Sequence, residues 1–424
     1  MKPLYTILFA LSIILINPWG QMRGEIWTIP KILILFLITF SNLIILLECR
    51  LSANKFPRLS RTWKIQLLLW GILLTCGLIS TLKSPFPWHS FLGQEQMRDG
   101  WLYWLLLGGF TLSNTLLLQR YPNLFPAQYR GLILGGLFIS LSIFPQILDW
   151  RIDYTATSGQ LLQSNILAST IFRNQQPIGL YSHRGHASFV LAVVSTLTLL
   201  LWRSHSLSKQ QAIALLSPFI AALFLTQTRM GILAFFGATA YILGDKIKKV
   251  LPFLLIGAIA LGSWTTWRQI DKLSPLNQAT SGRVGMWEQA IRGIEMRPVW
   301  GWGYNGHGIA HPYSDRWNPA PARVLRMDAI SFTGEFATGK IQTRPIPTHK
   351  AHNLILDTVQ SLGIVGFLAY FVLFNCYFFF TFHSPFPKLA AIALIYLIFT
   401  FTWFDCAQYS HLLWWSFSKR DRLS

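Results

Sequence analysis

The segment KILILFLITFSNLIILL, residues 31–47, is apolar over almost its whole length and decides the class of fold. A membrane helix needs about 20 predominantly apolar residues, because each residue adds about 1.5 Å across a hydrocarbon core about 30 Å thick. Similar runs recur along the chain, and one short candidate follows them at 408–418. The sequence therefore predicts an all-α integral membrane protein of about 12 transmembrane helices. The longer runs cover residues 4–20, 31–47, 65–82, 101–118, 130–148, 186–202, 211–227, 229–244, 250–267, 353–380 and 388–404.

The composition supports this class and argues against several others. Hydrophobic residues make up 52% of the 424 residues and charged residues only 12%, against roughly a quarter in soluble domains. The net charge of +20 does not indicate a nucleic-acid-binding protein, because the Lys and Arg residues are scattered between apolar runs rather than gathered on one domain. The four cysteines are far apart and lack CxxC spacing, so they indicate neither a zinc site nor a disulfide framework.

The distribution of positive charge predicts the topology. With the N-terminus inside and the spans alternating from there, most Lys and Arg residues fall in cytoplasmic connections, as the positive-inside rule requires. Both termini are then cytoplasmic. Residues 1–267 form nine transmembrane helices, 268–350 form a large extracytoplasmic loop, and 351–424 form the C-terminal helices. The first span lacks a small-residue cleavage site, so we expect it to be retained rather than removed as a signal peptide.

The long outer segment is expected to be structured, because it is rich in Pro, Gly and Trp. Within it, Val284, Trp287, Ile291 and Ile294 recur at spacings of three and four, which predicts an amphipathic helix over residues 281–297. Pro298 would end this helix. Its N-terminus would place Arg283 beside free backbone N–H groups, where an anion binds readily.

Three residues are candidates for chemistry. Arg229 lies between two apolar runs at the predicted outer face, where its guanidinium could bind two phosphate oxygens; an interfacial arginine reaching for water is the structural alternative. Arg283 could also bind phosphate, although surface arginines are common on amphipathic helices. His352 begins a long apolar helix, where it could act as a base or serve only as a packed side chain.

Two further polar groups precede spans. His183, Arg184 and His186 lie at the outer entry to the sixth span and could contact an anionic headgroup or a sugar, or form a solvated flank. Arg98, before the fourth span, gives a weaker signal of the same kind. The sequence contains no DxD, P-loop, HExxH or GxSxG motif. No carboxylate lies deep within a predicted span, with Asp357 the nearest, and this argues against an ion-coupled transporter.

The motifs resemble those of the O-antigen ligase and polymerase superfamily of bacterial membrane glycosyltransferases. The most specific match is His352-Asn353, followed at the family's spacing by Gly363 and Gly366. Two departures concern the substrate: the family's usual Ser before the first arginine is Thr228, and an Asn-Pro-Asn-like element is replaced by residues 182–186. Supporting matches are Thr228-Arg229-Met230-Gly231, Ser281-Gly282-Arg283 leading to Trp287 and Pro298, and the turn Gly301-Trp302-Gly303.

The resemblance implies a function at the outer face of the bacterial inner membrane. Arg229 and Arg283 would bind the diphosphate of a polyprenyl-linked glycan, and His352 would act on the hydroxyl of a lipid or glycan acceptor. The transfer would be inverting and would need no nucleotide, metal or other cofactor, and no nucleic acid partner is implied. A ligase is the leading interpretation. A polymerase of the same superfamily, a solute or inorganic-carbon carrier, and a structural membrane subunit remain alternatives.

Overall fold

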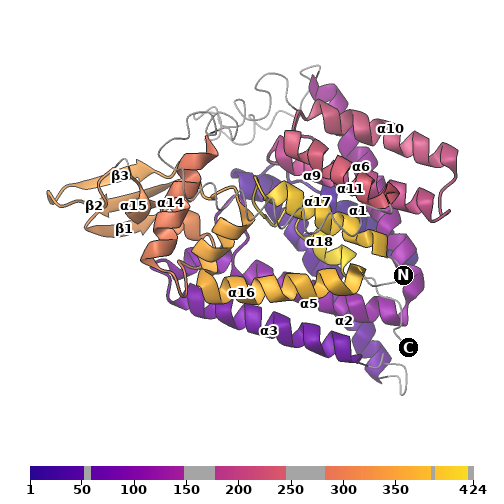
Figure 1. Ribbon diagram of the computed structural model, residues 1–424, viewed down its shortest axis with the longest axis horizontal. Helices are drawn as coiled ribbons and strands as arrows, with labels where there is room; N and C mark the ends of the chain where they lie inside the picture. The colour runs from indigo at the N-terminus through magenta and orange to yellow at the C-terminus, as the bar shows by residue number, and fades with distance from the viewer. Residues whose placement is uncertain (52–58, 148–176, 245–281, 317, 383–386, 419–424) are drawn as a thin grey trace.

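The computed structural model describes residues 1–51, 59–147, 177–244, 282–316, 318–382 and 387–418, which form a largely helical molecule (Figure 1). Each predicted span in these ranges coincides with a helix; the predicted span at 250–267 lies outside the described residues. The apolar helices are α1 (Lys2–Ile14), α2 (Ile29–Leu51), α3 (Arg61–Leu82), α5 (Trp101–Arg120), α6 (Phe125–Ile147), α9 (Arg184–Arg203), α10 (Lys209–Leu225), α11 (Arg229–Leu243), α16 (Leu354–Phe382) and α17 (Ala390–Thr400).

Six helical segments of the described chain are long and apolar enough to cross a membrane. They are Gly24–Leu51, Arg61–Leu82, Trp101–Arg120, Pro122–Ile147, Arg184–Arg203 and Leu354–Phe382, the first and fourth including the turns Gly24–Thr28 and Pro122–Leu124 that lead into α2 and α6. Helices α1, α10, α11 and α17 are apolar but shorter. The helical membrane architecture is thus present, whereas the total of about 12 spans stays a prediction.

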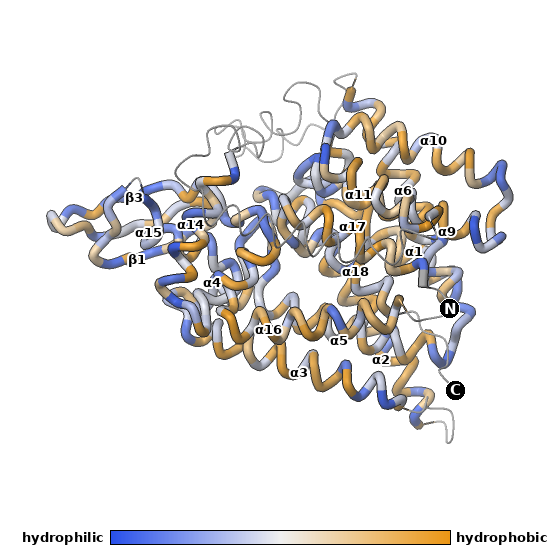
Figure 2. The backbone as a smooth tube through the Cα atoms, viewed as in Figure 1, coloured by the Kyte–Doolittle hydropathy of each residue, from blue (hydrophilic) through white to orange (hydrophobic). Residues whose placement is uncertain are grey.

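The helices of the bundle consist largely of hydrophobic residues (Figure 2), and many of their large apolar side chains are exposed, as lipid requires. On α2, five large side chains at helical spacing are between 51% and 56% exposed: Leu33, Phe36, Phe40, Leu43 and Leu47. An exposed apolar stripe of this size is rare on a soluble monomer, where it would favour aggregation. In contact with lipid hydrocarbon, the same stripe is not exposed to water.

The centre of the bundle holds α9 and the last described helix. Every residue of α9 from Gly185 to Leu201 is buried, which is why this helix is apolar on all sides. The predicted short twelfth span contains α18 (His411–Ser416), a six-residue helix buried inside the bundle. Its Trp414 ring lies 4.7 Å from the ring of Trp70, and Trp415 Nε1 donates a hydrogen bond to Gln128 at 2.9 Å.

The long outer segment folds at the end of the molecule opposite the N-terminus (Figure 1). It contains α14 (Arg283–Met296), which confirms the predicted amphipathic helix, and α15 (Gly306–Ser314). It also contains an antiparallel sheet in the order β1-β2-β3, so the all-α prediction was incomplete. The strands are β1 (Arg323–Met327), β2 (Ser331–Glu335) and β3 (Ile341–Pro345); the remaining short helices are α4 (Pro87–Leu92) and the turn Pro387–Leu389.

The outer segment is locked to α16 at a break in that helix. Gly363 has φ 67° and ψ −177°, a conformation that essentially only glycine adopts. Residues 298–303 lie against this break: the Ile364 N–H donates to the carbonyl of Pro298 at 2.9 Å, and the Gly303 N–H donates to that of Ser361 at 2.8 Å. A Cβ on Gly363 would lie 2.1 Å from the carbonyl oxygen of Val299. The two glycine motifs found in the sequence therefore meet in space.

Candidate functional site

The site is built at the first turn of α16, where Asn353 fixes the backbone beside His352. Asn353 caps the helix, since its Oδ1 accepts hydrogen bonds from the N–H groups of Ile355 and Leu356 at 3.0 and 3.1 Å. Its Nδ2 donates to the carbonyl of Phe401 at 3.1 Å, which ties α16 to the end of α17. Such caps satisfy N–H groups that have no partner within the helix. The Asn of the His-Asn pair therefore positions the His.

His352 itself is held in a strained backbone and an aromatic cage. Its φ is 55°, a left-handed conformation that costs about 1–2 kcal/mol for a residue with a Cβ. Just before it, the Ala351 N–H donates to Asp357 Oδ1 at 2.7 Å. The imidazole stands nearly perpendicular to the rings of Trp403 and Phe404, with centroids 4.9 and 4.8 Å apart. Packing thus sets the orientation of the ring.

Trp403 brings several of the sequence-predicted residues together. The Arg283 guanidinium lies 5.5 Å from the centre of its indole ring, within the range of a cation–π contact. The centre of the His183 ring is 4.9 Å from that of Trp403. The His186 ring lies 6.3 Å from Trp403 and 5.6 Å from Phe404. Residues from α14, α9 and α16 therefore converge around one tryptophan.

Burial, assisted by nearby cations, keeps His183 and His352 neutral. Burial, followed by the charge of Arg283, lowers the pKa of His352 to about 3. Burial, followed by the charges of His186, Arg184 and Arg23, lowers the pKa of His183 well below its ordinary value. A neutral imidazole can accept a proton, whereas an imidazolium cannot. The imidazole of His352 is therefore available to accept a proton, and a bound anion that raises its pKa would make it a more effective base.

Arg184 and Arg229 begin neighbouring helices. Arg184 is half-buried at the start of α9, while Arg229 is exposed at the start of α11. The two helix starts lie side by side, because a Cβ on Gly231 would approach Ser188 Oγ to 2.4 Å. Of the two predicted phosphate ligands, Arg283 contacts Trp403, and no contact with Trp403 is seen for Arg229 among the described residues.

Arg98 and Arg23 both act electrostatically on the carboxyl group of Glu95. The sequence did not indicate a role for Arg23. Glu95 Oε1 accepts a hydrogen bond from the Gly24 N–H at 2.8 Å. Burial raises the pKa of Glu95, and the charges of Arg98 and Arg23 act in the opposite direction. Because Arg23 also acts on His183, it belongs with the residues around Trp403. The three arginines Arg23, Arg184 and Arg283 are called the cationic cluster below, and the neutral His183 and His186 lie beside them.

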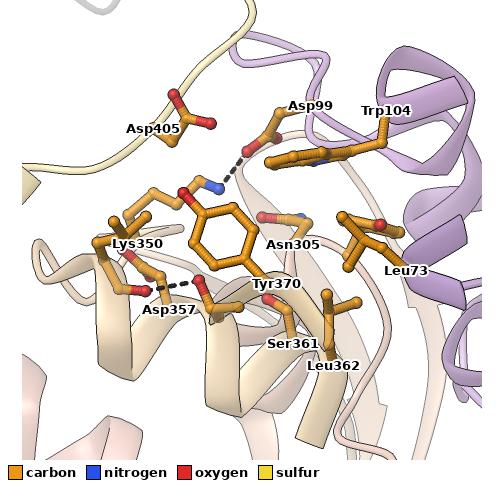
Figure 3. Close-up of a pocket in the computed structure, with 13 residues that line it drawn as sticks. Leu73, Asp99, Trp104, Asn305, Lys350, Asp357, Ser361, Leu362, Tyr370 and Asp405 are labelled. Atoms are coloured by element: carbon orange, nitrogen blue, oxygen red, sulfur yellow. Dashed lines mark hydrogen bonds and ion pairs between the residues drawn. The ribbon is translucent and has the colours of Figure 1, made fainter. Parts of the chain in front are cut away.

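A pocket next to His352 is lined by acidic residues, in contrast to the cationic cluster (Figure 3). Asp99, Asp357 and Asp405 line it, and Asp99 forms an ion pair with Lys350. Burial raises the pKa of Asp405 to about 8. Burial acts to lower the pKa of Lys350, but Asp99 and the other two carboxylates raise it overall. This acidic pocket was missed, because its three carboxylates come from segments far apart in the chain.

The acidic pocket weakens one argument made from the sequence. The lack of deep carboxylates within the predicted spans argues against ion-coupled transport when the sequence is considered alone. Yet Asp99, Asp357 and Asp405 are each less than 9% exposed, and they line one pocket. Buried acidic residues are therefore present, and a carrier is not excluded on this ground.

Acid should destabilise the fold through its buried histidines. Burial lowers the pKa of His307 to about 4 and that of His349 to about 3, as for His352. The unfolded chain takes up these protons below about pH 6.5 and the folded chain does not, so the histidines lower the stability as the pH drops from there toward about 4, and the raised pKa of Asp405 offsets part of this loss. Thermal unfolding in detergent between pH 7 and 4 measures this loss. A His349→Gln protein should show a shallower decline; a profile flat for both proteins would contradict the assignment.

Comparison with known proteins identifies part of the chain. Residues 212–371 match the family model described as O-antigen ligase. The matched range runs from α10 through the outer segment into α16, and so contains Arg229, Arg283 and His352. A search of curated proteins finds no match. Residues 212–371 are therefore similar to the O-antigen ligase family, and the resemblance of the motifs to the O-antigen ligase and polymerase superfamily is confirmed.

Proposed function

We propose that this chain transfers a glycan from a polyprenyl-diphosphate carrier to a hydroxyl acceptor at the outer face of the bacterial inner membrane, with both termini cytoplasmic. The observation that carries the proposal is the meeting of Arg283 and His352 at Trp403. A fixed cation and a neutral base side by side are what displacement of a diphosphate by a hydroxyl requires. The matched O-antigen ligase family supports the same chemistry.

The cationic cluster would bind the donor diphosphate. Guanidinium groups suit phosphate because they can donate two parallel hydrogen bonds and stay charged at any physiological pH. Arg283 supplies one such group, and Arg184 and Arg23 lie close to the same histidines. Arg229, at the adjoining helix start, is placed to add another as the donor enters from the lipid. These cations would also stabilise the charge that develops on the departing polyprenyl diphosphate.

The transfer would proceed in one displacement. The acceptor oxygen forms a bond to the anomeric carbon while the bond from that carbon to the diphosphate oxygen breaks, and His352 takes the hydroxyl proton. Donor binding helps this step, because the bound negative charge offsets the cations that lower the pKa of His352. Attack from the face opposite the leaving group inverts the anomeric configuration. No nucleotide or metal is needed in this scheme, because the diphosphate is already a leaving group.

Arg283→Ala should raise the KM for the donor by about 10- to 100-fold, because a hydrogen bond to a charged group contributes about 1.5–3 kcal/mol. Arg283→Lys should recover part of the loss, since it restores the charge but not the planar fork. Initial rates against donor concentration provide the measurement. The matched control is Arg326→Ala, which removes an exposed arginine paired with Asp328 on the sheet. Equal KM values for the Arg283→Ala and Arg326→Ala proteins would remove Arg283 from the donor site.

The structure of the product tests the proposed reaction. Nuclear magnetic resonance of the new glycosidic bond should show an inverted anomeric centre, and retention would contradict a single displacement. Product length separates the two enzymes of the superfamily. A ligase adds one chain to each acceptor, whereas a polymerase yields a ladder of repeats on the polyprenyl carrier.

A second function, that of a solute or inorganic-carbon carrier, is favoured by the acidic pocket. Asp99, Asp357, Asp405 and Lys350 could exchange protons or cations during transport. Uptake of labelled bicarbonate into liposomes containing the protein, with and without a proton gradient, distinguishes this function. Gradient-dependent uptake together with no glycan transfer would favour the carrier.

A further inference from the structure

The acidic pocket contains polar groups that have no partner. One carboxylate oxygen on each of Asp99, Asp357 and Asp405 is buried and accepts no hydrogen bond from the described residues. The same holds for the Asn305 Oδ1 and the Tyr304 hydroxyl, on side chains 4% and 5% exposed. Leaving such a group unsatisfied costs about 1–3 kcal/mol, so a cluster of five favours binding of water or of a polar ligand here.

The chemistry of these groups defines the ligand. Each of these groups has an oxygen that can accept a hydrogen bond, while the Lys350 ammonium is engaged by Asp99. A ligand that donates hydrogen bonds would satisfy them, and the acidic lining disfavours an anion. The side walls are aromatic: Trp104 and Tyr370 line the pocket, and the ring of Trp104 stacks on that of Tyr304 at 6.1 Å. Hydroxyl groups on an otherwise apolar ring meet both conditions, and a neutral sugar has this form.

The position of the pocket assigns that sugar to the acceptor side. Three short segments each place one residue in the acidic pocket and a near neighbour among the groups around Trp403 or Glu95. Lys350 precedes His352, Asp405 follows Phe404, and Asp99 follows Arg98. The donor diphosphate belongs with the cationic cluster. We infer that the acidic pocket binds the hydroxyl-bearing edge of the acceptor sugar and presents it to His352. The assignment of this sugar as the acceptor rests on the proposed transfer reaction.

Direct binding of simple glycosides tests this inference without relying on catalysis. Saturation-transfer difference spectra would be recorded for the full-length protein in lipid nanodiscs with methyl α-glucoside and with the corresponding glucuronide. We expect the neutral glycoside to bind and the uronate to bind more weakly. Tyr304→Phe and Asp405→Asn should each weaken glycoside binding by up to about tenfold, the equivalent of one hydrogen bond.

Two controls separate binding from folding. Tyr304→Phe removes an unpaired buried hydroxyl and Asp405→Asn removes only the possibility of a buried charge, so thermal stability should stay the same or rise. Tyr103→Phe removes a hydroxyl paired with Ser410 at 2.6 Å outside the pocket; it should lower stability and leave glycoside binding intact. Undiminished binding to the Tyr304→Phe and Asp405→Asn proteins would overturn the inference. Preferential binding of the uronate, or no binding of the neutral glycoside to wild type at millimolar concentration, would do the same.

The inference and the proposed function can fail separately. His352→Ala should slow transfer by about 100-fold or more but keep glycoside binding, because His352 does not line the pocket. Glycoside binding that depends on Asp405, in a protein without transferase activity, would sustain the sugar site and reject the function. Transfer that is insensitive to Tyr304→Phe and Asp405→Asn would sustain the proposed function and reject the sugar site.

Discussion

His352→Ala is expected to slow glycan transfer by about 100- to 10,000-fold, the usual contribution of a general base. The substitution removes the neutral imidazole that would take the acceptor proton and leaves Arg283 in place beside Trp403. The donor KM should therefore change far less than kcat. Initial rates of transfer by the purified protein in nanodiscs measure both quantities.

His205→Ala provides a matched control for this loss. His205 also has a left-handed backbone, with φ 57°, but it is exposed on the connection between α9 and α10. The strain caused by a Cβ at positive φ is thus the same in both variants, while only one imidazole lies at the site. Transfer by the His205→Ala protein should be unchanged. Full activity of a folded His352→Ala protein would exclude His352 as the base.

Gly363→Ala is expected to lower the free energy of unfolding by about 3 kcal/mol or more, combining a left-handed backbone penalty with an overpacked contact. The new Cβ would lie 2.1 Å from the Val299 carbonyl oxygen and 2.5 Å from the Trp300 nitrogen, both backbone atoms. The outer segment must then separate from α16, and Arg283 should lose its place beside His352. Thermal unfolding and the transfer rate should therefore fall together.

Gly71→Ala is the control for glycine replacement in an apolar helix. Gly71 lies within α3, and a Cβ there would meet no atom within 4 Å. Alanine should stabilise this helix by about 0.5–1 kcal/mol, because glycine has the greater backbone entropy when unfolded. Similar melting temperatures for the Gly71→Ala and Gly363→Ala proteins would show that the break at Gly363 is not required.

The helices were predictable because their signal is local. An apolar run of membrane length requires a helix in lipid, so the starts of α9, α11 and α16 could be located to within a few residues. The sheet was not predictable in the same way. Its strands have five residues each and alternate poorly in hydrophobicity, since β1 and β3 are largely exposed.

The candidate site was predictable where one motif spans it. His352-Asn353 and Gly363 lie on one helix, and their spacing is fixed in the sequence. Arg23 and Asp99 could not be found this way, because each is a single charged residue in a connection far from residue 352. Their proximity to the site arises only when the helices assemble. Trp403 was missed for a related reason: eighteen tryptophans are expected at membrane interfaces, and nothing local distinguishes this one.

The most direct test of the central claim is transfer by the purified wild-type protein from a polyprenyl-diphosphate glycan to a hydroxyl acceptor, with chelator present and nucleotide absent. We predict that free polyprenyl diphosphate and glycosylated acceptor appear in equal amounts. Verified folded protein that releases no polyprenyl diphosphate and forms no product across several donors and acceptors would contradict the account.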